Sequence, residues 1–251
     1  MNQRILLMSS SRKDSLGYLE HADDQIHHLL RKEPRKVIFV PYAAVTFSFD
    51  KYEEIVQPVF QRLGYELEAI HRHADPVRAI EQADAIAVGG GNTFALLKRM
   101  YEAGIVPAIR AKVQAGTPYV GWSAGSNVAG PTIRTTNDMP VVQPPTLRAL
   151  GLVPFQINPH FISGKPVGHN GESREERLAE FLEINVPEAV FALPEGSALY
   201  ADGTHGTVLG ERPALHFTHE AAPVQVAAGE AFPLSRIQGP ADLQNWPDFK
   251  I

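Results

Sequence analysis

The chain has 251 residues, of which 44% are hydrophobic and 20% charged, a composition typical of a globular protein long enough for one large α/β domain. Its formal net charge of -5 and its scattered basic residues argue against nucleic-acid partners. It contains no cysteine, which excludes disulfides, thiolate metal sites and a cysteine nucleophile.

Short apolar runs alternate with longer amphipathic segments through the first half of the chain. The apolar runs predict buried strands at 4–8, 37–40, 85–90 and 118–122. The amphipathic segments predict helices at 18–32, 52–64, 92–104 and 107–116. Strands that alternate with helices indicate an α/β fold with a mostly parallel, doubly wound sheet covered by helices on both faces.

The middle of the chain, residues 131–165, is rich in Pro, Thr and Asn and shows little periodicity. A long irregular stretch inside a compact domain is usually functional. A helix is predicted after it, at 172–185, and the segments 189–210 and 213–232 indicate strands and tight turns. The pair Asp202-Gly203 predicts a hairpin turn.

No internal repeat, linker or composition shift divides the chain. We therefore expect a single domain over residues 1–251, with a short C-terminal tail from about residue 233. The tail contains Trp246 and Phe249, which we expect to pack on the surface.

The stretch YVGWSAGSNVAG, residues 119–130, holds Ser123 between two glycines at Gly-x-Ser-x-Gly spacing. The motif directly follows a predicted buried strand, which is the context of a nucleophile elbow. Gly121 and Gly125 relieve the crowding of such a strained turn. The serine hydroxyl is then exposed at the carboxyl edge of the sheet, where the N–H of Ala124 faces a developing oxyanion. The motif alone also arises by chance in a chain with 20 glycines, so its position after the strand carries the interpretation.

The run GGGN, residues 89–92, also ends a predicted strand and precedes a helix. Consecutive glycine N–H groups approach a ligand closely, so this run predicts the other half of an oxyanion hole or a phosphate cradle. The dinucleotide-binding pattern G-x-G-x-x-G is not met, because Thr93 and Phe94 fill its later positions. A simple strand-to-helix turn is the competing interpretation.

A nucleophilic serine needs a base and an orienting acid. Among ten histidines, His160 in INPHF is the best placed, because it closes a short apolar run after the irregular stretch. Glu195 in LPEGSAL and Asp138 in RTTNDMP are the candidate acids, and either could fix the tautomer of His160. A turn glutamate and an Asx-turn aspartate are the plain alternatives, and spacing alone does not choose between them.

The segment IHRHAD places His71, His73 and Asp75 close together in sequence. Such a spacing suggests a metal site, but a surface loop is the favoured interpretation. We expect no metal and no cofactor.

Six motifs occur in an order that resembles the S51 family of serine peptidases: VGGGNTFALLK, GWSAGSN, PTIRTTNDMP, INPHF, GESREERL and LPEGSAL. The similarity runs from the N-terminus to about residue 230. It implies a three-layer sandwich of the class I glutamine-amidotransferase type, which is flavodoxin-like. It also implies metal-independent hydrolysis of dipeptides that carry an unblocked N-terminal aspartate.

The resemblance also implies roles for single residues. Ser123 would be the nucleophile and His160 the general base. Glu195 or Asp138 would be the orienting acid, and Glu195 is favoured for geometry. The chain order Ser123, His160, Glu195 differs from the Ser, Asp, His order of α/β-hydrolases.

The oxyanion would be held by backbone N–H groups of Ala124, Gly90 and Gly91. Arg174 matches the family arginine proposed to grip the substrate aspartate, since a guanidinium binds a carboxylate with two hydrogen bonds. Without the resemblance, Arg174 is interpreted as a solvated helix residue that pairs with neighbouring glutamates. We also expect Asn92 to contact the substrate.

One of Glu172, Glu175 and Glu176 is a further candidate, for the free α-amino group of the substrate. The expected partners are therefore Asp-X dipeptides. No apolar segment approaches the about 20 residues of a membrane helix, and the run at 5–8 is too short for a signal-peptide core. We expect a cytoplasmic monomer or homodimer that binds no membrane and no nucleic acid.

Three alternatives remain at the level of sequence. One is a different exopeptidase of the same family, such as a cyanophycinase-like enzyme. Another is an esterase of the α/β-hydrolase type, which needs a late histidine such as His216 or His219. The third is a binding module that kept the fold without catalysis.

Overall fold

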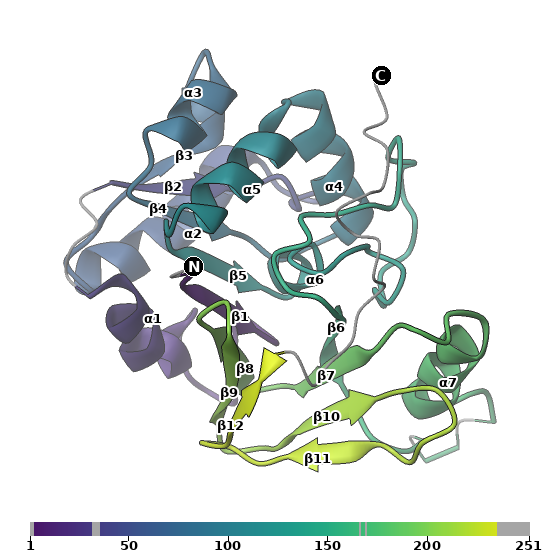
Figure 1. Ribbon diagram of the computed structural model, residues 1–251. Helices are drawn as coiled ribbons and strands as arrows, with labels where there is room; N and C mark the ends of the chain where they lie inside the picture. Colours follow the sequence, from purple (N-terminus) through teal and green to yellow (C-terminus); the bar gives the residue numbers. More distant parts are fainter. Residues whose placement is uncertain (1–2, 32–35, 166, 169, 235–251) are drawn as a thin grey trace.

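The computed structural model describes residues 3–31, 36–165, 167–168 and 170–234. An eight-stranded sheet in the order β12-β9-β8-β1-β5-β4-β2-β3 lies at the centre of the molecule (Figure 1). Its strands are β1 (Ile5–Met8), β2 (Lys36–Val40), β3 (Glu66–Ala69), β4 (Ala85–Val88), β5 (Tyr119–Trp122), β8 (Ser197–Ala201), β9 (His205–Gly210) and β12 (Ala231–Pro233). The five strands from β1 to β3 in this order are parallel, and the other three extend the sheet in antiparallel fashion.

Helices cover both faces of this sheet (Figure 1). One face packs against α1 (Asp23–Leu30) and α2 (Phe49–Arg62), and the other against α3 (Pro76–Glu81), α4 (Thr93–Glu102) and α5 (Ile105–Gln114). Strand β1 shows the cause, because successive strand side chains point to opposite faces. Leu6 lies in the core with α1 and α2, whereas Ile5 and Leu7 lie in the core with α3, α4 and α5.

A second, four-stranded sheet has the order β11-β10-β7-β6. It consists of β6 (Gln156–Phe161), β7 (Val190–Pro194), β10 (Ala214–Phe217) and β11 (Val224–Val226). Helix α7 (Arg174–Ile184) packs on it through Leu178 and Leu182, which contact a small core around Phe161 and Phe217. This sheet brings the end of β6 towards the first sheet, as Figure 1 shows.

The predicted three-layer α/β sandwich is confirmed, and all four predicted parallel strands are present within two residues of the predicted ends. The predicted helix at 18–32 is divided, because Leu19 adopts a left-handed φ of 57° and a 3-10 turn, η1 (Glu20–Ala22), precedes α1. Strand β3, the 3-10 turn η2 (Ile70–Arg72) and helix α3 complete a βα unit that the pattern did not separate. The hairpin at Asp202-Gly203 joins β8 to β9 as predicted.

The carboxyl ends of the parallel strands converge on one edge of the large sheet. Strand β5 ends at Trp122, β4 at Val88 and β1 at Met8, so the segments that follow them become neighbours. Ligands bind at this edge in open α/β folds. The sheet therefore assembles Ser123, the GGGN run and Ser9 in one place.

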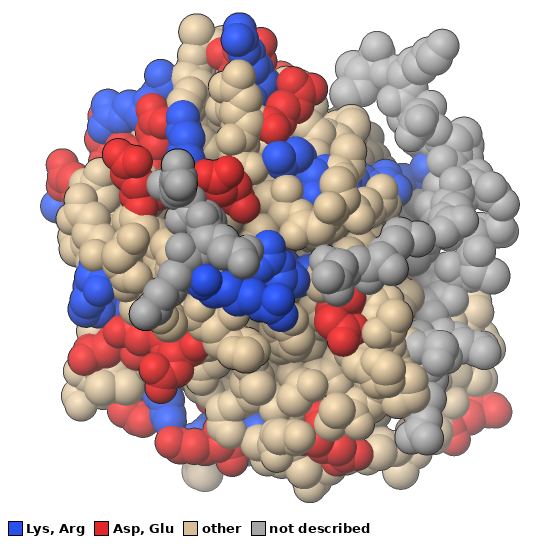
Figure 2. Space-filling view, turned by 60° about the vertical axis from the view of Figure 1, so that its left-hand side comes forward, with Lys and Arg blue, Asp and Glu red and all other residues tan. Residues whose placement is uncertain are grey.

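Within the described ranges, no helix combines the length and the apolar character needed to cross a bilayer. On the face drawn in Figure 2, basic and acidic side chains lie interspersed among uncharged ones. This face therefore carries both positive and negative charges. The predicted tail residues Trp246 and Phe249 lie outside the described part of the chain.

Candidate active site

Ser123 lies at the junction between β5 and the short helix α6 (Ala124–Asn127), with φ 52° and ψ -114°. A positive φ in a residue with a side chain is strained, and such strain gathers at functional sites. The two flanking glycines are required by close packing. A Cβ on Gly121 would lie 2.5 Å from the carbonyl oxygen of Gly125, and a Cβ on Gly125 would lie 2.1 Å from that of Val88. The predicted strand–turn–helix elbow is thus present.

Buried hydrogen bonds hold the strained turn. The N–H of Ser123 donates to the carbonyl of Met8 at 3.0 Å, which fixes the elbow to the end of β1. The hydroxyl of Ser126 lies 2.7 Å from the same carbonyl, and the phenol of Tyr119 donates to Gly125 at 2.7 Å. Several contacts together thus hold the strained backbone of Ser123, and this is how a strained residue persists in a folded protein.

His160 also has a left-handed backbone, with φ 54°, where the pairing of β6 with β7 shifts register. Its backbone is held on both sides. Its N–H donates to the hydroxyl of Ser9 at 2.9 Å, and its carbonyl accepts from the guanidinium of Arg174. Ser9 is fully buried and donates in turn to Leu193 at 2.8 Å. The backbone of His160 is therefore held, directly or through Ser9, by three other segments of the chain.

The side chains of Ser123, His160 and Glu195 form one continuous chain of contacts. His160 Nε2 lies 2.9 Å from Ser123 Oγ, and His160 Nδ1 lies 2.8 Å from Glu195 Oε1. Glu195 stands in the turn between β7 and β8, before Gly196, whose φ of 78° closes that turn. The spacing of these residues in the sequence could not predict their contact, because they lie in or next to strands of two different sheets.

The tautomer of the histidine follows from its partners. An ionised carboxylate only accepts hydrogen bonds, so Nδ1 carries the proton and Nε2 presents a lone pair to the serine hydroxyl. The imidazole is 37% exposed and the Glu195 side chain 58% exposed. An exposed ion pair contributes little to stability, so this contact orients the ring more than it stabilises the fold.

The GGGN run approaches the serine closely. A Cβ on Gly90 would lie 2.9 Å from the Cβ of Ser123, so only glycine permits this distance. Within the described residues, the N–H groups of Gly90, Gly91 and Ala124 donate to no acceptor, whereas those of Gly89 and Asn92 donate to the carbonyls of Val40, at the end of β2, and of Ala43. The glycine run and the start of α6 thus offer three backbone donors in the two segments that adjoin Ser123.

The side chains of Asp138 and Asn92 both bind within the chain, and Asp138 does not contact His160 as one prediction had it. The Asp138 carboxylate accepts from the backbone N–H of Thr93 at 2.7 Å and from its hydroxyl at 2.5 Å, and it makes no contact with His160. The side chain of Asn92 caps α4 through Ala95 and donates to Met139 at 2.8 Å. Both side chains secure the start of α4, directly after the glycine run.

Arg174 is the first residue of α7, at a capping box formed by Ser173 and Glu176. Its guanidinium is half-buried and donates to His160, with Pro159 at the longer distance of 3.5 Å. Burial and the neighbouring Arg177 lower its pKa, which Glu195 partly offsets. One edge of the guanidinium is thus occupied by the backbone of β6, while its remaining N–H groups keep donor capacity.

The three glutamates near Arg174 also have partners in this structure. Glu172 faces Arg177 at 3.8 Å, and Glu176 pairs with Lys165 at 2.9 Å. Glu175 accepts from the Ser163 hydroxyl at 2.6 Å and from the Gly164 N–H at 2.8 Å. Burial alone would raise the pKa of Glu175, but these hydrogen bonds outweigh it and lower the pKa. Glu175 therefore fixes the loop that follows β6.

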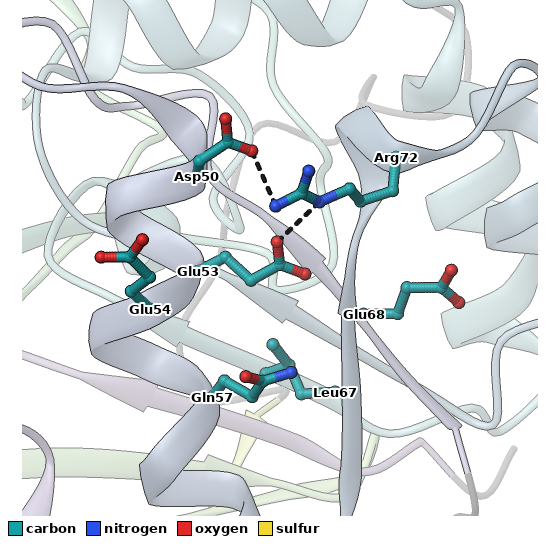
Figure 3. A pocket seen from close by; sticks show the side chains of 7 residues that line it. All are labelled: Asp50, Glu53, Glu54, Gln57, Leu67, Glu68 and Arg72. Atoms are coloured by element: carbon teal, nitrogen blue, oxygen red, sulfur yellow. Dashed lines mark hydrogen bonds and ion pairs between the residues drawn. The ribbon is translucent and has the colours of Figure 1, made fainter.

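A second group of acidic residues lies between α2 and β3, in a hollow of about 390 Å³ (Figure 3). Asp50, Glu53 and His71 place ligand atoms within 4.8 Å of one another, which is a spacing a metal could use. Arg72 already neutralises both carboxylates, at 2.8 Å from Asp50 and 2.9 Å from Glu53. The group is explained as an ion-pair cluster that ties α2 to the end of β3.

Within the described ranges, the other histidines that the sequence suggested have different partners. His73 pairs with Glu68, and the predicted neighbour Asp75 caps α3, so these residues do not converge on one point with His71. His216 packs near the ring of Phe191, and His219 faces two glutamates. The histidine that contacts Ser123 is His160, not one of the late histidines that the α/β-hydrolase pattern requires.

Comparison with known proteins agrees with this architecture. The model of peptidase family S51 matches residues 5–209. The chain is 54% identical over 219 residues to Peptidase E of Actinobacillus pleuropneumoniae serotype 7, covering 87% of this chain and 94% of the relative. It is also 54% identical over 211 residues to Peptidase E of Haemophilus influenzae strain Rd, covering 84% and 97%.

Solved structures show the same fold. A peptidase from an acI-B1 Actinobacterium superposes with a TM-score of 0.69 at 18% identity, covering 93% of this chain and 97% of that one. A protein from Listeria monocytogenes EGD-e gives a TM-score of 0.64 at 21% identity, with coverage of 84% and 99%. The family match and the close relatives together show that this chain is a peptidase and belongs to peptidase family S51.

Proposed function

We propose that this peptidase is a serine-type dipeptidase that hydrolyses dipeptides with an N-terminal aspartate. The observation that carries the proposal is the contact chain from Ser123 through His160 to Glu195, at the carboxyl edge of a parallel sheet. In this proposal Ser123 is the nucleophile, His160 the general base and Glu195 the orienting acid. Asp138 supports α4 instead, since its carboxylate is occupied by Thr93.

The reaction follows from the tautomer of His160. Nε2 takes the proton of the Ser123 hydroxyl as Oγ attacks the peptide carbonyl carbon. The resulting oxyanion accepts from the free N–H groups of Ala124 and of Gly90 or Gly91. His160 then gives the proton to the leaving amine, the C–N bond breaks, and aspartate remains as an ester on Ser123. Water, deprotonated by the same imidazole, releases the aspartate and restores the serine.

Substrate choice is assigned to Arg174. A half-buried guanidinium beside His160 offers a planar donor pair to the aspartate side chain, and lysine would not reproduce that geometry. In this proposal Asn92 contacts the substrate through the backbone of its loop, because its side chain already caps α4. The α-amino group is left to a glutamate of the segment 172–176, with Glu175 the nearest to the loop after β6.

The experiment is a panel of peptides in the presence of EDTA: Asp-Leu, Leu-Asp, Ala-Leu and N-acetylated Asp-Leu. We expect release of aspartate from Asp-Leu alone, and none with Ser123→Ala. Hydrolysis of Ala-Leu at a similar rate would refute the aspartate specificity. Loss of all activity in EDTA, restored by a divalent cation, would refute the metal-independent serine mechanism. Cleavage of none of the four by folded protein would indicate another exopeptidase specificity within the family.

A further inference from the structure

Three aromatic side chains lie directly beneath the glycine run and are joined through their polar atoms. The indole Nε1 of Trp122 lies 2.9 Å from the Tyr18 hydroxyl and 3.1 Å from the Tyr52 hydroxyl. The two hydroxyls are 3.0 Å apart, and the Tyr52 hydroxyl donates to the carbonyl of Gly90 at 2.9 Å. Trp122 is fully buried and Tyr52 is 3% exposed, so this is an internal network. The network includes none of the three residues Ser123, His160 and Glu195.

The direction of each hydrogen bond in this network is fixed by chemistry. The Gly90 carbonyl only accepts, so the one proton of the Tyr52 hydroxyl points at it. The Tyr52 oxygen then accepts from Trp122, and the proton between the two phenols must come from Tyr18. Burial raises the pKa of Tyr18, and it raises that of Tyr52 well above the ordinary value. Both phenols therefore stay neutral donors at any ordinary pH.

The contact with Gly90 sets the orientation of a whole peptide unit. In a planar trans peptide, the carbonyl of Gly90 and the N–H of Gly91 point in opposite directions. Tyr52 holds the carbonyl from the buried side, so the N–H of Gly91 is turned to the opposite side, and Gly90 of the same peptide unit lies against Ser123. This N–H has no acceptor within the described residues, and Gly91 has a φ of 133° that only glycine adopts readily.

We propose that Tyr52 is a positioning residue for peptide hydrolysis, whose hydroxyl locks the Gly90–Gly91 peptide so that the Gly91 N–H faces the oxyanion. The inference rests on the proposed serine mechanism and goes beyond it. Trp122 immediately precedes the nucleophile and donates to the same hydroxyl, so the Tyr52 hydroxyl contacts both the elbow and the oxyanion loop. A preorganised donor of this kind acts without reorganisation at the moment of reaction.

The test compares Tyr52→Phe with Tyr18→Phe. Both remove one buried hydroxyl from the same network, but only Tyr52 bonds to Gly90. The first readout is the rate at which a fluorophosphonate modifies Ser123, because its phosphoryl oxygen occupies the oxyanion site. The second is kcat and KM for Asp-Leu. We expect Tyr52→Phe to slow modification by about tenfold or more and to lower kcat with KM little changed. We expect Tyr18→Phe to stay within about twofold of wild type.

Thermal unfolding of both variants separates positioning from stability, since each variant leaves buried partners unsatisfied. Modification of Tyr52→Phe at the wild-type rate, or equal slowing in Tyr18→Phe, would overturn the inference. The fluorophosphonate readout does not depend on aspartate specificity. If wild type is modified at Ser123 but does not cleave Asp-Leu, the substrate assignment fails and the rates still decide the role of Tyr52. If Ser123 is not modified at all, the serine mechanism and this inference fail together.

Discussion

At the scale of single residues, the site depends on some side chains that the sequence pattern indicates and on others that it does not. Ser123 and His160 could be selected from the sequence because each follows an apolar run at a glycine or proline signal, whereas Glu195 and Asp138 stayed alternative candidates for the acid. Ser9 could not, because a serine after a strand is ordinary. Its role becomes visible only in the folded structure, where the Ser9 hydroxyl accepts a hydrogen bond from the backbone N–H of His160. Tyr52 could not be selected from the sequence either, because its position in a helix predicts only core packing.

The choice between the two candidate acids also belongs to this scale. We predict that Glu195→Gln lowers kcat by about one to three orders of magnitude, because the amide no longer favours the Nδ1–H tautomer of His160. Asp138→Asn should retain kcat, because Asp138 contacts Thr93 rather than His160. Steady-state kinetics on Asp-Leu with both variants makes the comparison. A larger kcat loss in Asp138→Asn would reverse the assignment.

The same Asp138→Asn variant carries a stability prediction. A carboxylate that accepts from the first N–H of α4 interacts favourably with the helix dipole, and its loss should cost about 0.5–2 kcal/mol of unfolding free energy. Urea unfolding measures this. Glu195→Gln is the matched control, because its carboxylate is exposed and should leave stability unchanged within about 0.5 kcal/mol. Equal effects of the two variants would contradict this account.

At the scale of elements, β1, β2, β4 and β5 were predictable because they are apolar nearly throughout, whereas β3 alternates two glutamates with apolar residues and was not separated. The second sheet was predictable in part, because the segments 189–210 and 213–232 indicated strands and turns and contain β7, β10 and β11, but no strand was predicted at β6. Strand β6 falls inside the stretch that has little periodicity, and the left-handed backbone of His160 interrupts its pairing. The pattern thus predicted the strand that ends at Ser123, but it indicated His160 only through its sequence context.

The contact between the elbow and β4 gives a prediction at this scale. Gly125→Ala should destabilise the protein by about 3 kcal/mol or more, because the new Cβ would lie 2.1 Å from the backbone oxygen of Val88, which cannot move freely. Gly64→Ala is the control. Its φ of 84° is also positive, but a Cβ there meets nothing within 4 Å, so we expect a loss of about 1 kcal/mol. Chemical unfolding of both variants measures the difference, and equal losses would contradict the packing argument.

At the scale of the whole molecule, the family resemblance and the alternation of strands and helices were enough to predict the layered α/β architecture. They could not predict how the two sheets meet, because that depends on shared core packing. Ile157 of β6 and Phe191 of β7 lie in the same core cluster as Leu7 of β1. This packing brings the end of β6 to the carboxyl edge of the large sheet, and it completes the site.

Burial of tyrosines across this core predicts how stability depends on pH. Burial raises the pKa of Tyr18, Tyr42, Tyr52 and Tyr119 above the unfolded value of about 10. Below about pH 10 both states keep these protons, and the stabilisation is fully present. As pH rises further, the unfolded chain releases protons that the folded protein retains, so the unfolding free energy falls.

Urea unfolding between about pH 9 and pH 11 measures this loss, with tyrosinate absorbance reporting ionisation. Tyr119→Phe is the informative variant, because it removes one buried phenol and should make the fall with pH less steep. Titration of all seven tyrosines in the folded protein, with no change in unfolding free energy, would contradict the buried network.

Intact-mass analysis after fluorophosphonate treatment tests whether Ser123, activated by His160, is the nucleophile. We predict a single adduct, mapped by proteolysis to the peptide that contains Ser123. It should be absent in Ser123→Ala and form at least about tenfold more slowly in His160→Ala. A folded Ser123→Ala protein that still cleaves Asp-Leu at the wild-type rate, with any adduct on another residue, would contradict the claim.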